Sequence, residues 1–297
     1  MSLRAVLCAC LLFAQPALAA AVTIETARGP FEAEQPARVV VFDIAALDTL
    51  DALGVEPVGA PDSLYLPSLD HMKGKVEPVG TLFEPNFEAV AALDPDLIIV
   101  GGRSAAQFDA LSAIAPTIDM TIAGAPALIS DARSRLIAYG SLFGKEAEAQ
   151  GLAATLDAKV EAAKAAVADK GKGLTLLTNG PKMSAFGPGS RFGWVHSELG
   201  LPAAVATNYE GSHGEGVSFE FVQKANPDWL IVVDRAAAVG QEGESARQTL
   251  DNPLVAETTA WKKNQLVFLD PTSIYIANGG IRSLSGLLDQ ITTAFGK

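Results

Sequence analysis

The sequence contains almost no cysteine and little histidine. Of its 297 residues, two are cysteines, Cys8 and Cys10, and three are histidines. Both cysteines lie in a short apolar segment at the N-terminus, so the rest of the chain has no thiol for a disulfide, a metal site or a nucleophile. The motifs His-Glu-x-x-His and Gly-x-Ser-x-Gly are also absent, which argues against the zinc and serine hydrolases that use them.

Positive charge is scarce as well. The 22 Lys and Arg residues face 34 Asp and Glu residues, which gives a formal net charge of −12. Such a chain is not attracted in bulk to nucleic acid or to anionic lipid. An anionic ligand therefore has to be bound by a local cluster of cationic side chains.

The N-terminus has the features of an export signal. Arg4 precedes an apolar run at 5–14, and a small-x-small cleavage pattern follows at 17–19. We expect residues 1–20 to be removed, leaving a soluble periplasmic protein, because the run is shorter than the roughly 20 residues of a membrane span. A lipid-anchored form attached through Cys10 is the alternative.

After the signal, short apolar runs alternate with segments whose apolar residues recur every three or four positions. Buried strands that alternate with helices predict βα units on mostly parallel sheets. The expected strands are 39–42, 97–100, 174–177, 230–233 and 266–269, and the expected helices are 45–53, 87–93, 194–199 and 219–225.

An internal repeat indicates two related lobes. Residues 86–100 contain Asn-Phe-Glu-x-Val, then Asp-Pro-Asp and an apolar run. Residues 218–232 repeat this pattern, with Ser in place of the first Asn and Asn in place of the first Asp, at an offset of 132 residues (218 − 86 = 132). This offset is too long for a solenoid repeat of roughly 20–50 residues. It predicts duplication of a whole α/β lobe.

The segment between the two copies has a strongly helical composition. Residues 131–170 are rich in Ala, Glu, Lys and Leu and contain three glycines. We expect a helical spine over 131–170 that joins an N-terminal lobe, 21–130, to a C-terminal lobe, 171–297. A continuous spine would allow the lobes to open only slightly.

Three arginines each stand after a predicted strand: Arg103, Arg191 and Arg235. Open α/β sheets bind their ligands at the carboxyl ends of the strands. Taken singly, each arginine also fits a solvated surface charge. Together they predict a site with enough positive charge to hold an anion.

Two further side chains could contact a ligand. His213 lies in a glycine-rich loop at 208–216, where an imidazole can face a ligand, although alone it also fits an exposed loop histidine. Tyr275 lies in a predicted loop after the last strand, and alone it also fits a core tyrosine bonded to backbone. His196 falls within a predicted helix and is expected to be a packing or surface residue.

Together, these features resemble the substrate-binding proteins of bacterial ABC importers for iron complexes, and among them the catecholate (enterochelin-type) siderophore binders. The resemblance covers essentially the whole mature chain. It implies the class III periplasmic binding protein fold, in which a long helix joins two Rossmann-like lobes with mostly parallel sheets. It also implies a monomeric, non-enzymatic receptor that carries ferric siderophore to an inner-membrane permease and has no permanent cofactor. The segments that carry the resemblance are 86–99, 190–193, 213–214, 234–237 and 275–280.

The resemblance also implies a role for each site residue. His213 and Tyr275 would bind the iron of a tetradentate bis-catecholate, while Arg103, Arg191 and Arg235 would line the pocket. Ferric iron prefers six hard donors, and a two-catechol chelator supplies four of them. The family usually has aromatic-Tyr-Leu-Ser-Gly-Gly where this chain has Ile-Tyr-Ile-Ala-Asn-Gly-Gly.

Glu88 and Glu220 occupy matching places in the two repeats, each in the first turn of a predicted helix. An acid there interacts favourably with the helix dipole, by about 0.3–1 kcal/mol. The resemblance implies a second role, in which both glutamates dock onto arginines of the permease.

Other ligands and functions stay open at this point. A protein of the same fold could bind haem, a corrinoid or a hydroxamate siderophore, although a hydroxamate complex carries less negative charge for three arginines to offset. An exported hydrolase that uses Ser190, His213 and an aspartate is a further alternative.

Overall fold

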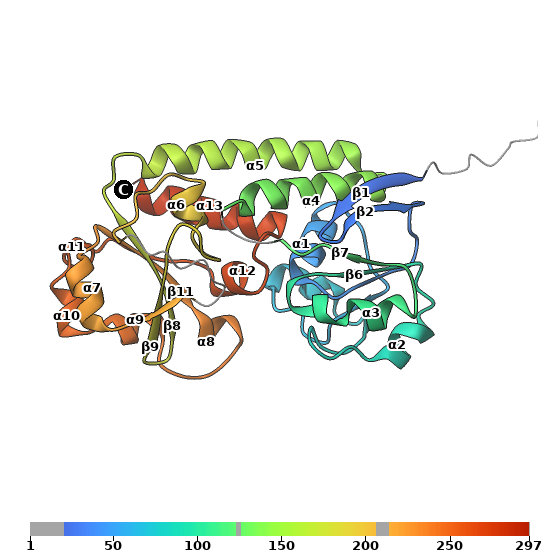
Figure 1. Cartoon of the computed structure of the whole chain (residues 1–297), viewed down its shortest axis with the longest axis horizontal. Helices are drawn as coiled ribbons and strands as arrows, with labels where there is room; N and C mark the ends of the chain where they lie inside the picture. The colour runs from blue at the N-terminus through green and yellow to red at the C-terminus, as the bar shows by residue number, and fades with distance from the viewer. Residues whose placement is uncertain (1–20, 123–125, 206–213, 297) are drawn as a thin grey trace, which may run out of the picture.

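The computed structural model describes residues 21–122, 126–205 and 214–296. Two α/β lobes lie side by side, and the helix α5 (Glu146–Val167) runs along both of them (Figure 1). Within the described ranges, no helix is both long enough and apolar enough to cross a membrane.

The sheet of the N-terminal lobe has five parallel strands in the order β5-β4-β3-β6-β7. Alternate residues of β3 enter two different apolar clusters, Val39 and Val41 in one and Val40 in the other, so the sheet is buried on both faces. Its elements are β3 (Val39–Val41), α1 (Ile44–Ala52), β4 (Gly59–Ala60), η1 (Pro67–Met72), β5 (Glu77–Pro78), α2 (Phe87–Ala92), β6 (Leu97–Val100), η2 (Gly102–Gln107), α3 (Phe108–Ser112) and β7 (Thr117–Asp119), preceded by a hairpin of β1 (Val22–Thr26) and β2 (Gly29–Ala33).

The sheet of the C-terminal lobe has the order β10-β9-β8-β11-β12. Strands β8, β11 and β12 are parallel, whereas β9 and β10 are antiparallel to their neighbours. The elements are β8 (Gly173–Asn179), β9 (Lys182–Phe186), α6 (Trp194–Ser197), β10 (Glu215–Val217), α7 (Phe219–Ala225), β11 (Trp229–Asp234), α8 (Arg235–Ala238), α9 (Ala246–Leu250), α10 (Pro253–Ala256), α11 (Thr259–Lys262), β12 (Leu266–Phe268), α12 (Pro271–Tyr275) and α13 (Ile281–Phe295).

The five strands and four helices predicted from the sequence are confirmed, and the repeat is visible in local geometry. Asn86 and Ser218 cap α2 and α7 by accepting hydrogen bonds from backbone N–H groups of the first turn. Each helix is followed by a residue in the left-handed region, Asp94 with φ 45° and Asn226 with φ 39°. The two copies therefore start and stop their helices in the same way.

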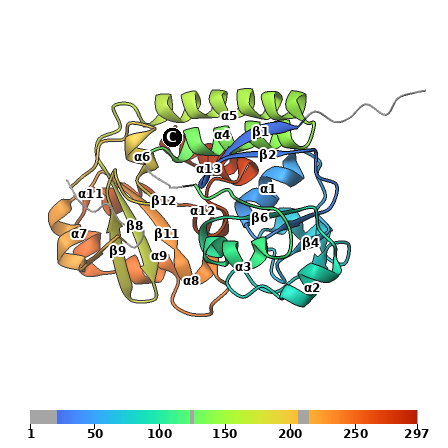
Figure 2. The ribbon, with the colours of Figure 1, turned by 45° about the vertical axis from the view of Figure 1, so that its right-hand side comes forward.

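The predicted spine over 131–170 is helical but not continuous. It consists of α4 (Leu128–Leu142) and α5, and Gly144 between them adopts a left-handed φ of +62°. With 22 residues, α5 is about 33 Å long and reaches across both lobes (Figures 1 and 2). The lobe boundaries proposed at 130 and 170 stay a prediction.

The helix α13 links the two lobes by a second route. The carboxylate of Asp48 in α1 accepts hydrogen bonds from the N–H groups of Arg282 and Ser283, both at 2.9 Å. The hydroxyl of Thr49 accepts one from Ile281 at 3.2 Å. Burial raises the pKa of Asp48. Side chains of α1 in the N-terminal lobe thus cap the start of α13, the helix that follows the Tyr275 segment.

Candidate functional site

Tyr275 stands at the junction of the lobes. The sequence predicted a loop here, but Tyr275 is the last residue of the short helix α12, which begins at Pro271 with Asp270 as its N-cap. Proline is favoured in the first turn because its missing N–H would be unpaired there in any case. In both views α12 lies between the two lobes (Figures 1 and 2).

Three guanidinium groups converge on Tyr275. From the N-terminal lobe, Arg103 donates to the carbonyl oxygen of Tyr275 at 2.7 Å and to that of Ile276 at 3.2 Å. Arg191 donates to the same Tyr275 carbonyl at 2.5 Å. Arg235 donates from Nε to the phenol oxygen at 3.1 Å. Arginine side chains from both lobes therefore contact the same residue, Tyr275.

The same arginines also lie near the tyrosine ring. The guanidinium carbons of Arg191, Arg103 and Arg235 are 4.8, 5.3 and 5.9 Å from the ring centroid. At these distances each cation is attracted by the negative face of an aromatic ring. This attraction offsets part of the repulsion between the three charges.

The cluster carries an excess of positive charge. None of the three arginines forms an ion pair with a carboxylate in the described part of the chain. Burial, together with the neighbouring charge of Arg103, lowers the pKa of Arg191 from its usual value to about 10. Concentrated cations without anionic partners can bind an anion through charge-assisted hydrogen bonds.

Two of the three arginines reach the cluster by the predicted route. Arg235 directly follows the parallel strand β11, Arg103 follows the parallel strand β6 after two glycines, and the two arginines are separated by the same offset of 132 residues as the repeat. The prediction is wrong for Arg191, which follows the antiparallel strand β9. Phe186 at the end of β9 pairs with Thr175 near the start of β8, so the turn after β9 has to return to the site.

The turn that carries Arg191 is tightly built. The hydroxyl of Ser190 donates to the carbonyl of Gly187 at 2.6 Å. Phe192 is 1% exposed and packs against Phe186 with ring centroids 4.7 Å apart. A Cβ on Gly193 would lie 2.1 Å from the Gly187 oxygen. Arg191 is therefore held between two buried neighbours.

We expect Gly193→Ala to lower the free energy of unfolding by about 1–3 kcal/mol or more, because its methyl group would overlap backbone carbonyls that cannot move freely. Gly286→Ala is the matched control, since a Cβ there meets nothing within 4 Å and alanine favours a helix interior by about 1 kcal/mol. Urea unfolding should show opposite signs for the two variants. Equal stability of both variants would contradict the tight turn.

Both the sequence and the fold of this chain are similar to those of known proteins. Residues 39–272 match the family model described as "Periplasmic binding protein". The chain belongs to this family. The petrobactin-binding protein YclQ of Bacillus subtilis is 36% identical to it over 262 residues, 87% of this chain and 82% of YclQ. The ferric-anguibactin-binding protein FatB of Vibrio anguillarum is 32% identical over 267 residues, 88% of this chain and 83% of FatB.

Solved structures show the same fold over nearly the whole binding protein. The crystal structure of YclQ matches with a TM-score of 0.87 and 33% identity, covering 94% of this chain and 99% of that one. The catecholate-siderophore binding protein VctP of Vibrio cholerae matches with a TM-score of 0.85 and 33% identity, covering 92% and 100%. The predicted class III fold, with two α/β lobes, is confirmed.

Of the three histidines, His71 and His196 lie in the part of the chain that the structure describes. His213, the predicted iron ligand, lies outside the described residues. His196 is a buried packing residue, as expected: its ring nitrogens lie 3.2 Å from the Thr175 hydroxyl and 2.8 Å from the Leu201 carbonyl, and burial lowers its pKa. His71 pairs with Asp51 at 2.9 Å.

Two residues near the cluster were missed from the sequence. Asn179 accepts a hydrogen bond from Arg235 at 3.2 Å and ends β8 at a two-residue hairpin. The turn dipeptide Gly180-Pro181, with Gly180 at a φ of +57°, is the hairpin signal that could have revealed it. Asp43 caps α1 directly after β3; burial raises its pKa, and the nearby charge of Arg103 opposes that rise.

Glu88 and Glu220 are exposed in the first turns of α2 and α7. Hydrogen bonds from the Ser218 hydroxyl and from its own backbone N–H lower the pKa of Glu220. Next to Glu88, the side chain of Phe87 is 41% exposed. Both carboxylates are exposed, which agrees with the predicted docking role but does not test it.

Proposed function

We propose that this binding protein captures a ferric catecholate siderophore between its lobes and delivers it to an ABC permease for iron uptake. The observation that carries the proposal is the convergence of Arg103, Arg191 and Arg235 on Tyr275. The names of its relatives support it: YclQ is a petrobactin-binding protein, FatB binds ferric anguibactin, and VctP binds catecholate siderophores. The iron is cargo that arrives within the ligand.

A catecholate complex suits this cluster chemically. Deprotonated catechols bring negative charge, which guanidinium groups offset through hydrogen bonds and by stacking on the aromatic rings. Three arginines without described carboxylate partners can supply both interactions. A hydroxamate complex carries less negative charge and makes less use of three cations.

We further propose a tetradentate bis-catecholate as the preferred cargo. Such a chelator leaves two of six iron positions open, and the phenol oxygen of Tyr275 and the imidazole of His213 would fill them. The phenol oxygen of Tyr275 accepts a hydrogen bond from Arg235. That contact orients the hydroxyl end of Tyr275 toward the arginine cluster.

Titration with several iron ligands tests the proposed function. Trp194 lies three residues after Arg191 and is fully buried, so tryptophan fluorescence should report ligand binding near the cluster. We expect tight quenching by a ferric bis-catecholate and much weaker quenching by a ferric hydroxamate, haem or cobalamin. Preference for any of the last three would refute a catecholate cargo.

Delivery to the permease gives a separate prediction. The double variant Glu88→Arg and Glu220→Arg should abolish iron uptake in cells, because reversed charges would repel arginines on the permease, while affinity for the ferric ligand stays unchanged. Glu161→Arg, on the exposed side of α5, is the matched control and should leave uptake intact. A loss of affinity equal to the loss of uptake would count against docking.

We also propose that the active form is a monomer that lacks residues 1–20, with lobes at 21–130 and 171–297 joined by the 131–170 spine. The export pattern of the sequence supports cleavage. Contacts of Arg103 with Tyr275 and Ile276 within one chain support a complete site in each molecule.

A further inference from the structure

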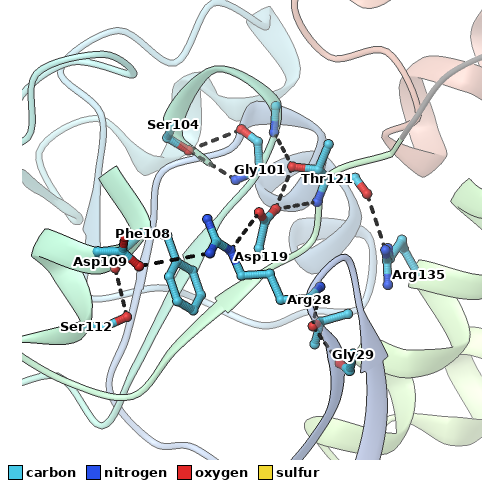
Figure 3. A network of polar contacts seen from close by, with 12 residues as sticks. Arg28, Gly29, Gly101, Ser104, Phe108, Asp109, Ser112, Asp119, Thr121 and Arg135 are labelled. Atoms are coloured by element: carbon cyan, nitrogen blue, oxygen red, sulfur yellow. Dashed lines mark hydrogen bonds and ion pairs between the residues drawn. The ribbon is translucent and has the colours of Figure 1, made fainter. Parts of the chain in front are cut away.

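A hydrogen-bond network holds the backbone just before Arg103 (Figure 3). Thr121 follows β7 on the neighbouring strand of the sheet, and its hydroxyl accepts a hydrogen bond from the N–H of Gly102 at 2.8 Å. Gly102 adopts a left-handed φ of +51°, and Gly101 before it packs against Asp43 with little room for a side chain. Arg103 thus leaves a turn that is held from within by the Ser104 hydroxyl, which bonds the N–H and the carbonyl of Gly101, and from outside by Thr121.

Asp119 fixes the orientation of the Thr121 hydroxyl that bonds to Gly102. Its Oδ1 accepts hydrogen bonds from both the N–H and the hydroxyl of Thr121, so the hydroxyl proton points to Asp119 and a lone pair faces Gly102. The other oxygen of Asp119 accepts a hydrogen bond from Arg28 at 3.4 Å. Arg28 lies over the ring of Phe108, 3.9 Å from its centroid.

In this arrangement Asp119 pairs with Arg28 and not with Arg103. Asp119 is a nearly buried carboxylate, with 8% of its side chain exposed, and its charge is paired with Arg28. Both of its oxygens are occupied by Arg28 and Thr121. Asp119 is therefore bound to Arg28 and Thr121, while the Arg103 guanidinium donates to the carbonyl oxygens of Tyr275 and Ile276.

We propose that Thr121, held by Asp119 and Arg28, is a positioning residue for Arg103. The proposal rests on the function inferred above, since Arg103 would bind the anionic ligand. Thr121 does not touch that ligand itself; it fixes the backbone from which the Arg103 side chain reaches the carbonyl oxygens of Tyr275 and Ile276.

The first test needs no ligand. In protein labelled with ¹⁵N-arginine, the Nε–H signal of Arg103 is assigned by its loss in Arg103→Gln. We expect Thr121→Val to shift and broaden this signal, and Thr121→Ser, which keeps the hydroxyl, to restore it. Thr117→Val removes another buried hydroxyl of β7, bonded to the Ala115 carbonyl, and should leave the signal unchanged. An unaltered signal in Thr121→Val would overturn the proposal.

The second test measures binding of a ferric bis-catecholate. Thr121→Val should weaken binding about five- to tenfold, part of the contribution of a charge-assisted hydrogen bond, whereas Thr121→Ser and Thr117→Val should bind like the unmodified protein. In an Arg103→Gln background, Thr121→Val should cost nothing further. An equal loss in both backgrounds would refute positioning through Arg103. If the unmodified protein fails to bind, the proposed cargo is wrong, and the arginine signals still decide the role of Thr121.

Discussion

Replacing Tyr275 with phenylalanine should weaken binding of a ferric bis-catecholate about 10- to 100-fold, a loss that even the hydrogen-bond partners of metal ligands can cause. The visible charge-transfer band of the complex should move to shorter wavelength or lose intensity. His213→Ala should do the same, because either change leaves one iron position without a protein donor. Absorption spectra and fluorescence titrations measure both effects.

Tyr275→Phe is a conservative probe of iron ligation. It removes only the phenol oxygen, so the ring and the backbone carbonyl that bind Arg103 and Arg191 remain. A hexadentate tris-catecholate, which already saturates iron, serves as control, and its affinity should depend far less on Tyr275 or His213. Unchanged spectra and affinity for the bis-catecholate in both variants would refute direct ligation.

Arg191→Met should make the ligand-free protein more stable while it weakens ligand binding. Burial lowers the pKa of Arg191 to about 10, which means that its site disfavours the charged form by about 3 kcal/mol relative to water. Because methionine removes both the buried charge and its repulsion with Arg103, we expect the free energy of unfolding to rise by about 1–3 kcal/mol. Affinity for the ferric complex should fall about tenfold or more, since one charge-assisted contact is lost.

Arg235→Met provides the comparison for this trade-off. Arg235 donates to two side-chain oxygens, those of Asn179 and Tyr275, so its removal should lower stability as well as affinity. Urea unfolding of both ligand-free variants, followed by titration, separates the two effects. A ligand-free Arg191→Met protein that is less stable and binds with full affinity would show that Arg191 has only a structural role.

Periodicity in the sequence was enough to find the long, buried elements. The runs that became β3, β6, β8, β11 and β12 are almost entirely apolar, which is typical of strands buried on both faces. It could not find β4 and β5, because each has two residues and owes its position to pairing with β3 or β4. It also missed β9, although the turn dipeptide Gly180-Pro181 indicates the hairpin.

Amino-acid composition alone did not predict the break between α4 and α5. Helix-favouring residues run through 131–170, and propensity alone predicts one helix. Gly144, with a φ of +62° just after the C-cap Phe143, is a local helix stop, and the Phe143 carbonyl also accepts a hydrogen bond from Gln35, 108 residues earlier in the chain. The helix therefore ends where a distant segment packs against it.

The sequence alone determined the class of the fold, the duplication of the lobe and the placing of Arg103 and Arg235 after matching strands, because these depend on local patterns that repeat along the chain. Only the tertiary structure decided that Arg103 and Arg191 meet at the carbonyl of Tyr275. These contacts join residues 172 and 84 positions apart, and they exist because α12 lies between the two lobes. Such convergence depends on how whole elements pack, which no pattern within one segment records.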